Sequence, residues 1–114
     1  FAVFNSEEDI ANINPNFDLL KKLPGQGLII SSLSKKYDFV SRYFCPKFGI
    51  NEDPVTGSAH TTLIPYWSEK LNKSSMMAKQ ISKRGGVLFC ENLEDRVLIG
   101  GNATLYMKGE VEIN

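Results

Sequence analysis

The last third of the chain alternates between apolar and polar residues, and this pattern constrains the fold more than any other feature. The alternation runs through residues 76–82, 87–90, 96–99 and 103–113, and short segments rich in Gly, Asn and charged residues separate the runs. This spacing predicts strands joined by tight turns, and therefore an antiparallel sheet. Because a sheet must cover its apolar face, another element has to pack on it.

One long helical pattern can provide that cover. It begins in the segment 53–57 and ends at Leu71. Its apolar residues occur at helical spacing around most of the circumference, and they are Ala59, Leu63, Ile64, Tyr66, Trp67 and Leu71. Such a helix is typically buried rather than lying on a surface. We therefore expect an α+β domain in which a curved, barrel-like antiparallel sheet wraps around one central helix.

The first half of the chain carries weaker signals. Residues 1–4, 28–32 and 37–45 are predicted strands, and residues 46–52 form a predicted loop. Ser6 and Asn16 are typical N-cap residues for two short helices. Since no repeat or linker interrupts the sequence, we expect residues 1–114 to form a single domain.

Charge and cysteine content exclude several functional classes. Thirteen Lys and Arg residues balance 13 Asp and Glu residues, so the chain lacks the basic surface that binding to nucleic acid or an anionic membrane needs. No apolar run approaches the roughly 20 residues of a membrane-spanning helix. Cys45 and Cys90 form no C-x-x-C pair, which argues against a zinc site or a redox motif. The two cysteines could form one disulfide, but we expect two separate buried thiols in a cytoplasmic protein.

Small and polar residues gather at the start of the long helix, in the sequence E-D-P-V-T-G-S-A-H from Glu52 to His60. One interpretation is structural. Asp53 is a good N-cap with Pro54 in the first turn, and Thr56 is a second candidate cap. On composition alone, this interpretation is sufficient.

The other interpretation is a binding site. Gly57, Ser58 and Ala59 would present backbone N–H groups at the positive end of the helix dipole, where a carboxylate or phosphate can bind. Asp53 would then accept a proton-bearing group of the same ligand, such as an amine, a hydroxyl or an acidic C–H. The spacing fits this arrangement without being specific to it.

Other side chains are weaker candidates for a catalytic or binding role. His60 is the only histidine and has no second ligand nearby in sequence, so we expect no metal site, and a lone helical histidine is usually a packing residue. Ser58 and His60 are two residues apart and do not face each other on a helix, which excludes a local nucleophile–base pair. Arg84 either reaches an anionic ligand or lies in an exposed hairpin turn. Four aromatic residues either line a pocket or fill the core, and these are Tyr37, Tyr43, Phe44 and Trp67.

Three longer motifs resemble one known family. They are Y-D-F-V-S-R-Y-F from Tyr37 to Phe44, the block from Gly49 to His60, and Q-I-S-K-R-G-G from Gln80 to Gly86. In these motifs, and over nearly its whole length, the chain resembles the C-terminal half of the phenazine-biosynthesis-like (PhzF) isomerase family. The resemblance implies the diaminopimelate-epimerase-like fold, in which two similar barrel-like domains enclose an active site in the cleft between them.

The resemblance also implies a reaction and its residues. The family moves a proton on a small carboxylate-bearing substrate without a cofactor, using a glutamate aided by a histidine from the other half. By motif, Asp53 is the expected catalytic residue of this half. By the same motif, Gly57 and Ser58 are expected to hold the substrate. From their own positions, we expect Ala59, His60 and Arg84 to bind substrate with them.

The glutamate and histidine of the N-terminal half are not among these 114 residues. We therefore expect this chain to be catalytically incomplete by itself and to require that N-terminal domain. Either that domain or a second copy in a homo-dimer would cover the cleft-facing surface. Two alternatives stay open. One is a non-catalytic binding or interaction domain that retains the fold. The other is an amino-acid epimerase, which is disfavoured because the epimerase relatives have cysteine where this chain has Asp53.

Overall fold

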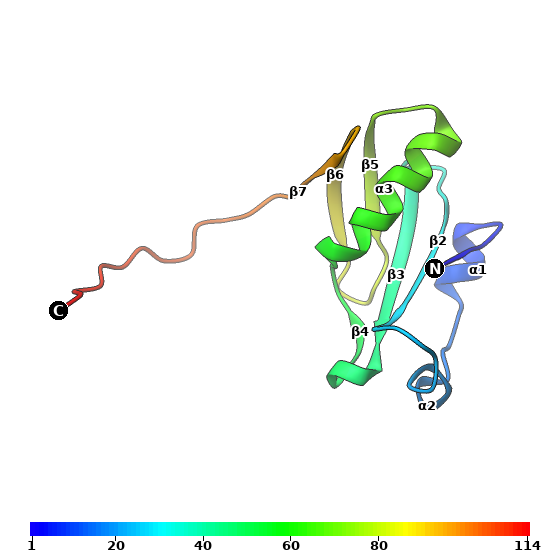
Figure 1. Cartoon of the computed structure of the whole chain (residues 1–114), viewed down its shortest axis with the longest axis horizontal. Helices are drawn as coiled ribbons and strands as arrows, with labels where there is room; N and C mark the ends of the chain where they lie inside the picture. Colours follow the sequence, from blue (N-terminus) through cyan, green and yellow to red (C-terminus); the bar gives the residue numbers. More distant parts are fainter.

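A mixed sheet of seven strands forms the body of the molecule (Figure 1). The structure is a computed structural model that describes every residue from 1 to 114. In chain order the elements are β1 (Ala2–Val3), α1 (Glu7–Ala11), α2 (Phe17–Leu20), β2 (Leu28–Leu33), β3 (Phe39–Cys45), the 3-10 helix η1 (Pro46–Phe48), β4 (Ile50–Asp53), α3 (Gly57–Leu71), β5 (Ser75–Gln80), β6 (Gly86–Leu93) and β7 (Arg96–Gly100). The strand order is β1-β2-β3-β5-β6-β7, and β4 pairs with the end of β3.

The caps of the two short helices are as predicted. The Ser6 hydroxyl accepts a hydrogen bond from the Asp9 amide at 3.1 Å, and the Asp9 carboxylate accepts one from the Ser6 amide at 3.1 Å. This reciprocal pair is a capping box. The Asn16 side chain accepts from the Leu19 amide at 3.0 Å and starts α2 in the same way. Local sequence therefore determines both helix starts.

Alternation along β3 places two cores on opposite faces of the sheet. Phe39 faces α3, whereas Val40, the next residue, faces α1. The larger core consists of Phe39, Leu63, Ile64, Trp67, Met76, Ala78, Leu88 and Cys90. The smaller core consists of Ile10, Ile30, Val40 and Phe44. Because β3 is covered on both faces, apolar residues occur at both parities of this strand.

The long helix α3 lies across one face of the sheet, and only one of its sides is buried (Figure 1). The buried side is formed by Ala59, His60, Leu63, Ile64 and Trp67. The other side, including Thr61 and Pro65, is exposed. Trp67 stacks on Phe39 with ring centroids 5.9 Å apart and donates from Nε1 to the Ser31 hydroxyl at 2.9 Å. No helix of the chain has the length and apolar character that crossing a membrane would require.

The predicted antiparallel barrel around a central helix is therefore not what the structure shows. The pairs β1–β2 and β3–β5 are parallel, and α3 lies in the connection that leads from β4 to β5. The sheet also ends at β7. Residues 103–113, predicted as a strand, belong to an extended tail (residues 101–114) that runs away from the body (Figure 1). A strand needs a partner for its backbone hydrogen bonds, and the tail has none here, so the sheet stays open.

Candidate functional site

The turn between β4 and α3 carries the residues that the sequence singled out. The predicted loop 46–52 includes the first three residues of β4, which pairs with β3 so that Asp53 lies opposite Tyr43. Asp53 is the last residue of β4, and Thr56 is the N-cap of α3. Of the two candidate caps, Thr56 therefore occupies the cap position. The Asp53 carboxylate instead accepts a hydrogen bond from the Thr56 hydroxyl at 2.6 Å.

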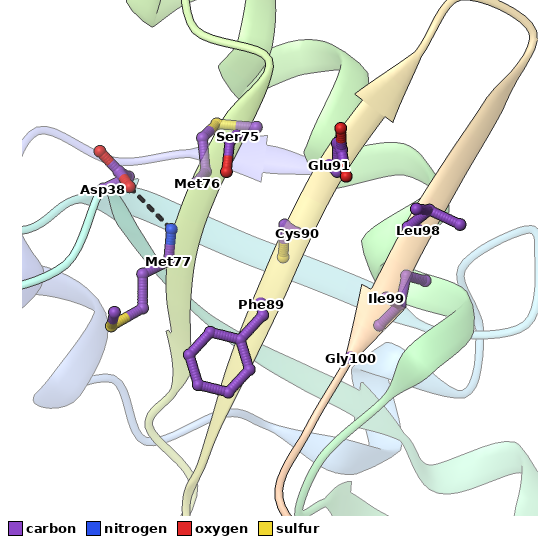
Figure 2. A pocket seen from close by; sticks show the side chains of 10 residues that line it. All are labelled: Asp38, Ser75, Met76, Met77, Phe89, Cys90, Glu91, Leu98, Ile99 and Gly100. Carbon is purple, nitrogen blue, oxygen red and sulfur yellow. Dashed lines mark hydrogen bonds between the residues drawn. The ribbon is translucent and has the colours of Figure 1, made fainter.

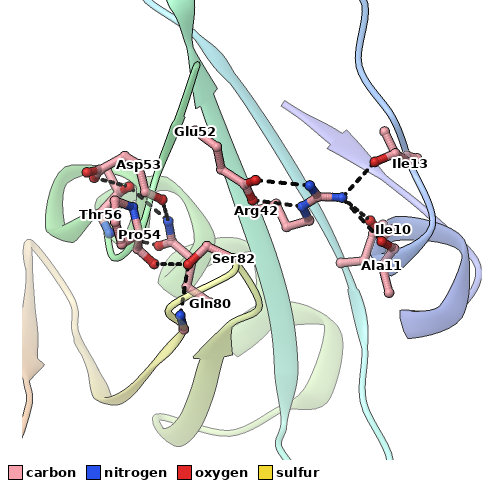
Figure 3. Close-up of polar contacts among 11 residues, drawn as sticks. Ile10, Ala11, Ile13, Arg42, Glu52, Asp53, Pro54, Thr56, Gln80 and Ser82 are labelled. Carbon is pink, nitrogen blue, oxygen red and sulfur yellow. Dashed lines mark hydrogen bonds and ion pairs between the residues drawn. The ribbon is translucent and has the colours of Figure 1, made fainter. Parts of the chain in front are cut away.

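Gln80, at the end of β5, holds this turn from the core side (Figure 3). Its side chain is fully buried. Its Oε1 accepts from the Thr56 amide at 2.8 Å, and its Nε2 donates to the Asp53 carbonyl at 2.7 Å and to the Thr56 hydroxyl at 3.0 Å. All three hydrogen bonds of this side chain go to the turn, so the turn is fixed to the central sheet.

A second contact places the 82–86 turn beside the start of α3. The Ser82 hydroxyl donates to the Pro54 carbonyl at 2.8 Å and accepts from the Gly85 amide at 3.0 Å. Gly86 packs so closely on Val55 that a Cβ there would lie 2.4 Å from a methyl carbon of Val55. This close approach, which only glycine permits, brings the segment containing Arg84 next to the helix start.

Glu52 is already committed to a structural ion pair. Its two carboxylate oxygens accept from Nε and one terminal nitrogen of Arg42 at 2.8 and 3.0 Å (Figure 3). The other terminal nitrogen of Arg42 donates to the carbonyls of Ile10 and Ile13 at 2.9 and 2.8 Å. Paired hydrogen bonds of this kind are strong and geometrically specific. Arg42 thus connects Glu52 on β4 to the end of α1. Because both oxygens of the Glu52 carboxylate are used in this ion pair, Glu52 is not free to act as an acid or base.

The start of α3 opens into a surface recess of about 630 Å³, called here the helix-start recess. Val55, Gly57 and Arg84 line it, together with the first residues of β6 and the end of β7. Gly57 and Ser58 are exposed, and an added Cβ at Gly57 would meet no atom within 4 Å. The structure therefore brings Gly57 and Arg84 to one recess, whereas Asp53 and Ser58 are not among the residues that line it. The side chain of Ala59, by contrast, is buried in the core.

His60 lies in the core and has no exposed surface. Its Nδ1 is 2.7 Å from the Thr56 carbonyl, which only accepts, so Nδ1 carries the proton and donates. Its Nε2 has no hydrogen-bond partner. Burial lowers the pKa of His60, although the contact with Thr56 acts to raise it. The structure thus gives His60 a role in holding the N-cap residue, and does not support the predicted contact with substrate.

The remaining candidates are also structural. Trp67 belongs to the larger core and Phe44 to the smaller one, so the aromatic residues do not line a common pocket. Cys45 and Cys90 are separate, buried thiols, as predicted. Burial raises the pKa of the Cys45 thiol and raises that of Cys90 to about 11. Neither thiol is part of the turn.

Gln80 and Ser82 belong to the third family motif, but the sequence analysis gave neither residue a role in the site. A signal for Gln80 was present in the alternation, because Met76, Ala78 and Gln80 share the inward face of β5. A glutamine at a core position must find hydrogen-bond partners.

Comparison with known proteins places these residues in a family. The family model described as phenazine biosynthesis-like protein (PhzC-PhzF) matches residues 1–109. The chain belongs to the PhzF family. The turn, Gln80 and Ser82 all lie within the matched part of this PhzF-family chain.

Several known proteins are similar to almost the whole of this PhzF-family chain. An uncharacterized isomerase from Pseudomonas aeruginosa is 47% identical over 112 residues, which are 98% of this chain and 43% of that protein. An uncharacterized isomerase from Halalkalibacterium halodurans is 49% identical over 94% of this chain and 41% of its own length. The crystal structure of a PhzF-family protein from Enterococcus faecalis is 52% identical, with a TM-score of 0.88, over 97% of this chain and 43% of that one. The chain thus spans less than half the length of these relatives.

Proposed function

We propose that this chain supplies the carboxylate-binding half of the active site of a cofactor-independent isomerase, which moves a proton on a small carboxylate-bearing molecule. One observation carries the proposal. Asp53, tied to the N-cap residue Thr56 at 2.6 Å, stands directly before a helix start whose first residues, Gly57 and Ser58, are exposed. The isomerase names of the relatives support the reaction class.

The helix start would bind the carboxylate of the substrate. Backbone N–H groups at the first turn of a helix have no partner within the helix, and the helix dipole favours an anion there. Arg84 lines the same recess and adds a positive charge. Because an added Cβ at Gly57 would meet no atom within 4 Å, there is room for an anion beside this residue.

Asp53 would receive another part of the same molecule. One of its oxygens accepts from Thr56, and its other oxygen, Oδ1, makes no hydrogen bond within the chain. Oδ1 can therefore accept from an amine, a hydroxyl or an acidic C–H of the bound molecule. The proton transfer itself needs a base that removes a proton from one carbon and returns it to another. We assign this step to the glutamate and histidine that the family resemblance places in the other half.

Within this chain, Glu52, His60 and the two cysteine thiols are not available for that step. Glu52 is paired with Arg42, and His60 is buried against the core. The thiols of Cys45 and Cys90 are buried, and burial raises the pKa of both, which disfavours the alternative of a thiol-dependent amino-acid epimerase. The chain alone should therefore turn over no substrate.

Two uncovered surfaces support a second half as partner. The first is the open face of β5, β6 and β7, where Met77, Phe89 and Leu98 are 43%, 45% and 54% exposed around a recess of about 470 Å³ (Figure 2). The second is the tail, in which Leu105 and Ile113 are 82% and 93% exposed. Large apolar patches are rarely left bare. We propose that the N-terminal half of the protein covers them and that any closed barrel around α3 forms only with its strands, a second copy being the alternative.

A hybrid protein tests the proposed reaction. In it, this chain replaces the matching part of the Enterococcus faecalis relative, and deuterium uptake from D₂O is measured for a panel of amino, hydroxy and unsaturated carboxylic acids. We expect uptake with the hybrid, none with the isolated chain, and a loss of at least about 100-fold in the Asp53→Asn hybrid.

Two outcomes would contradict the proposal. Uptake catalysed by the isolated chain would show that no second half is needed. A folded hybrid that binds the acids but exchanges no proton, under conditions in which the parent relative is active, would favour the rival interpretation of a non-catalytic binding domain.

A further inference from the structure

Gln80 is a polar side chain in an apolar position. It shares the inward face of β5 with the core residues Met76 and Ala78 and has no exposed surface. Burying an amide costs free energy unless its hydrogen bonds are made, and an apolar residue of similar shape is often tolerated equally well. Gln80 directs every one of its hydrogen bonds at the segment from Asp53 to Thr56. Its contacts therefore serve the turn rather than the core.

The direction of each hydrogen bond in this cluster is fixed by chemistry (Figure 3). The Thr56 amide can only donate, so the Gln80 atom 2.8 Å from it must be the acceptor Oε1. Nε2 then donates to the Thr56 hydroxyl at 3.0 Å. The hydroxyl, having accepted there, gives its own proton to Asp53 Oδ2 at 2.6 Å. Two hydrogen bonds in the same direction therefore connect the Gln80 side chain to the Thr56 hydroxyl and the Thr56 hydroxyl to the Asp53 carboxylate.

We propose that Gln80 is a positioning residue of the site, which acts through Thr56 to hold the Asp53 carboxylate so that Oδ1 faces the ligand. This inference rests on the proposed function and deepens it. Thr56 is also the N-cap of α3, so the same contacts set Asp53 relative to the amides of Gly57 and Ser58. The site then prefers an acid that carries a hydroxyl or amine next to its carboxylate over a simple carboxylate.

The chain offers matched variants. Gln80→Met keeps the length of the side chain and removes its hydrogen bonds. Thr56→Val removes the hydroxyl with little change of shape, and Thr56→Ser restores it. Asn92→Ala is the control, because Asn92 donates to the Ser68 hydroxyl at 3.1 Å and so joins β6 to α3 far along the helix from Asp53.

The experiment compares acetate with glycolate, which adds one hydroxyl. Amide chemical shifts of Gly57 and Ser58 report the dissociation constant of each acid. We expect glycolate to bind the wild-type chain about fivefold more tightly than acetate, the effect of one added hydrogen bond. The ratio should fall to about one in Gln80→Met and Thr56→Val, with acetate affinity nearly unchanged, and should be retained in Thr56→Ser and Asn92→Ala.

A second measurement reports the contact without any ligand. Hydrogen exchange of the Thr56 amide should be at least about tenfold faster in Gln80→Met than in the wild type or Asn92→Ala, because its acceptor is gone. An unchanged exchange rate, or a glycolate preference that survives in both Gln80→Met and Thr56→Val, overturns the inference. If acetate and glycolate shift no amide even in the wild type, the proposed carboxylate site is wrong, and the exchange rate alone then decides whether Gln80 holds the turn. If Gln80→Met does not fold, the comparison of Thr56→Val with Thr56→Ser decides.

Discussion

The hydroxyl of Thr56 lies 2.6 Å from a carboxylate oxygen of Asp53, and this contact joins the end of β4 to the start of α3. Asp53 is thereby held beside the helix instead of capping it. Neither Thr56 nor Asp53 makes a side-chain cap hydrogen bond to the first turn of α3. The positive end of the longest helix of the chain is therefore left to an external acceptor.

Replacing Gly57 with alanine should separate binding from stability. No atom lies within 4 Å of an added Cβ at this position, so the free energy of unfolding should change by less than about 0.5 kcal/mol. The methyl group would nonetheless stand beside the exposed helix start and weaken acetate binding. Urea unfolding and an acetate titration measure the two effects. A Gly57→Ala chain that binds acetate as well as the wild type would contradict the assignment.

Replacing Gly86 with alanine should lower the stability of the domain, unlike the replacement of Gly57. Its Cβ would lie 2.4 Å from a methyl carbon of Val55, so overpacking should cost about 1–3 kcal/mol. The cost should shrink in a Val55→Ala background, because the clashing methyl groups are then absent. A double-mutant cycle by urea unfolding checks this coupling. Equal costs in the two backgrounds would show that Val55 is not the obstacle.

Local sequence was sufficient to predict the elements whose signals are short in range. The capping box at Ser6, the cap at Asn16 and the strands β5 to β7 all follow from caps or from alternation. The sequence does not predict β4, because its pairing with β3 involves a register shift between Phe44 and Cys45, which no local pattern reveals. The tail was predicted as a strand because alternation indicates a capacity to pair, and the chain offers it no partner.

Acid should destabilise the domain through His60. Burial lowers the pKa of His60, so below about pH 6.5 the unfolded chain binds a proton that the folded chain does not. The free energy of unfolding should then fall by up to about 1.4 kcal/mol per pH unit as the pH decreases from 6.5. Urea unfolding between pH 5 and 8 measures this slope.

The variant His60→Gln, which keeps a donor for the Thr56 carbonyl, should flatten the slope in this range. Asp38 contributes only in stronger acid. Burial acts to raise the pKa of Asp38, but hydrogen bonds from Lys73 and the Met77 amide lower it on balance. The contribution of Asp38 to the free energy of unfolding is therefore lost only below about pH 4. A slope that persists in His60→Gln between pH 5 and 6.5 would assign the effect to another group.

The cysteines should be unreactive in the folded chain. Cys45 and Cys90 are 5% and 3% exposed, and burial raises the pKa of the Cys90 thiol to about 11. A thiol reagent such as iodoacetamide should therefore label neither residue under native conditions and both in denaturant. Mass spectrometry counts the labels. Rapid native labelling of either cysteine would show that the core is open where the structure has it closed.

Deletion of residues 103–114 should leave the isolated domain intact. The tail residues are exposed and belong to no helix or strand, so their removal should change the free energy of unfolding by less than about 0.5 kcal/mol. Any self-association of the isolated chain should decrease, because the exposed apolar residues of the tail are gone. Light scattering and urea unfolding test both statements. A large loss of stability would mean that the tail packs on its own domain.

The candidate site was predictable where it depends on adjacent residues and not where it depends on contacts distant in sequence. Asp53, Gly57 and Ser58 follow from one motif. The sequence does not show that Arg84 lies near them, because its position depends on the close contact of Gly86 with Val55. His60 belongs to the same motif, but the helical period turns its ring into the core. Gln80 contacts Thr56 across 24 residues of sequence. Its place in the third motif and its inward position on β5 were signals, but neither identifies Thr56 as its partner.

The most direct test of the account is an acetate titration of the ¹⁵N-labelled chain at constant ionic strength. The start of α1, where the capping box occupies donors that α3 leaves free, provides an internal control. The account predicts saturable shifts at the amides of Gly57, Ser58 and Ala59, with none at Glu7 to Asp9. Shifts of equal size at both helix starts, or none at Gly57 and Ser58 at saturating acetate, would contradict it.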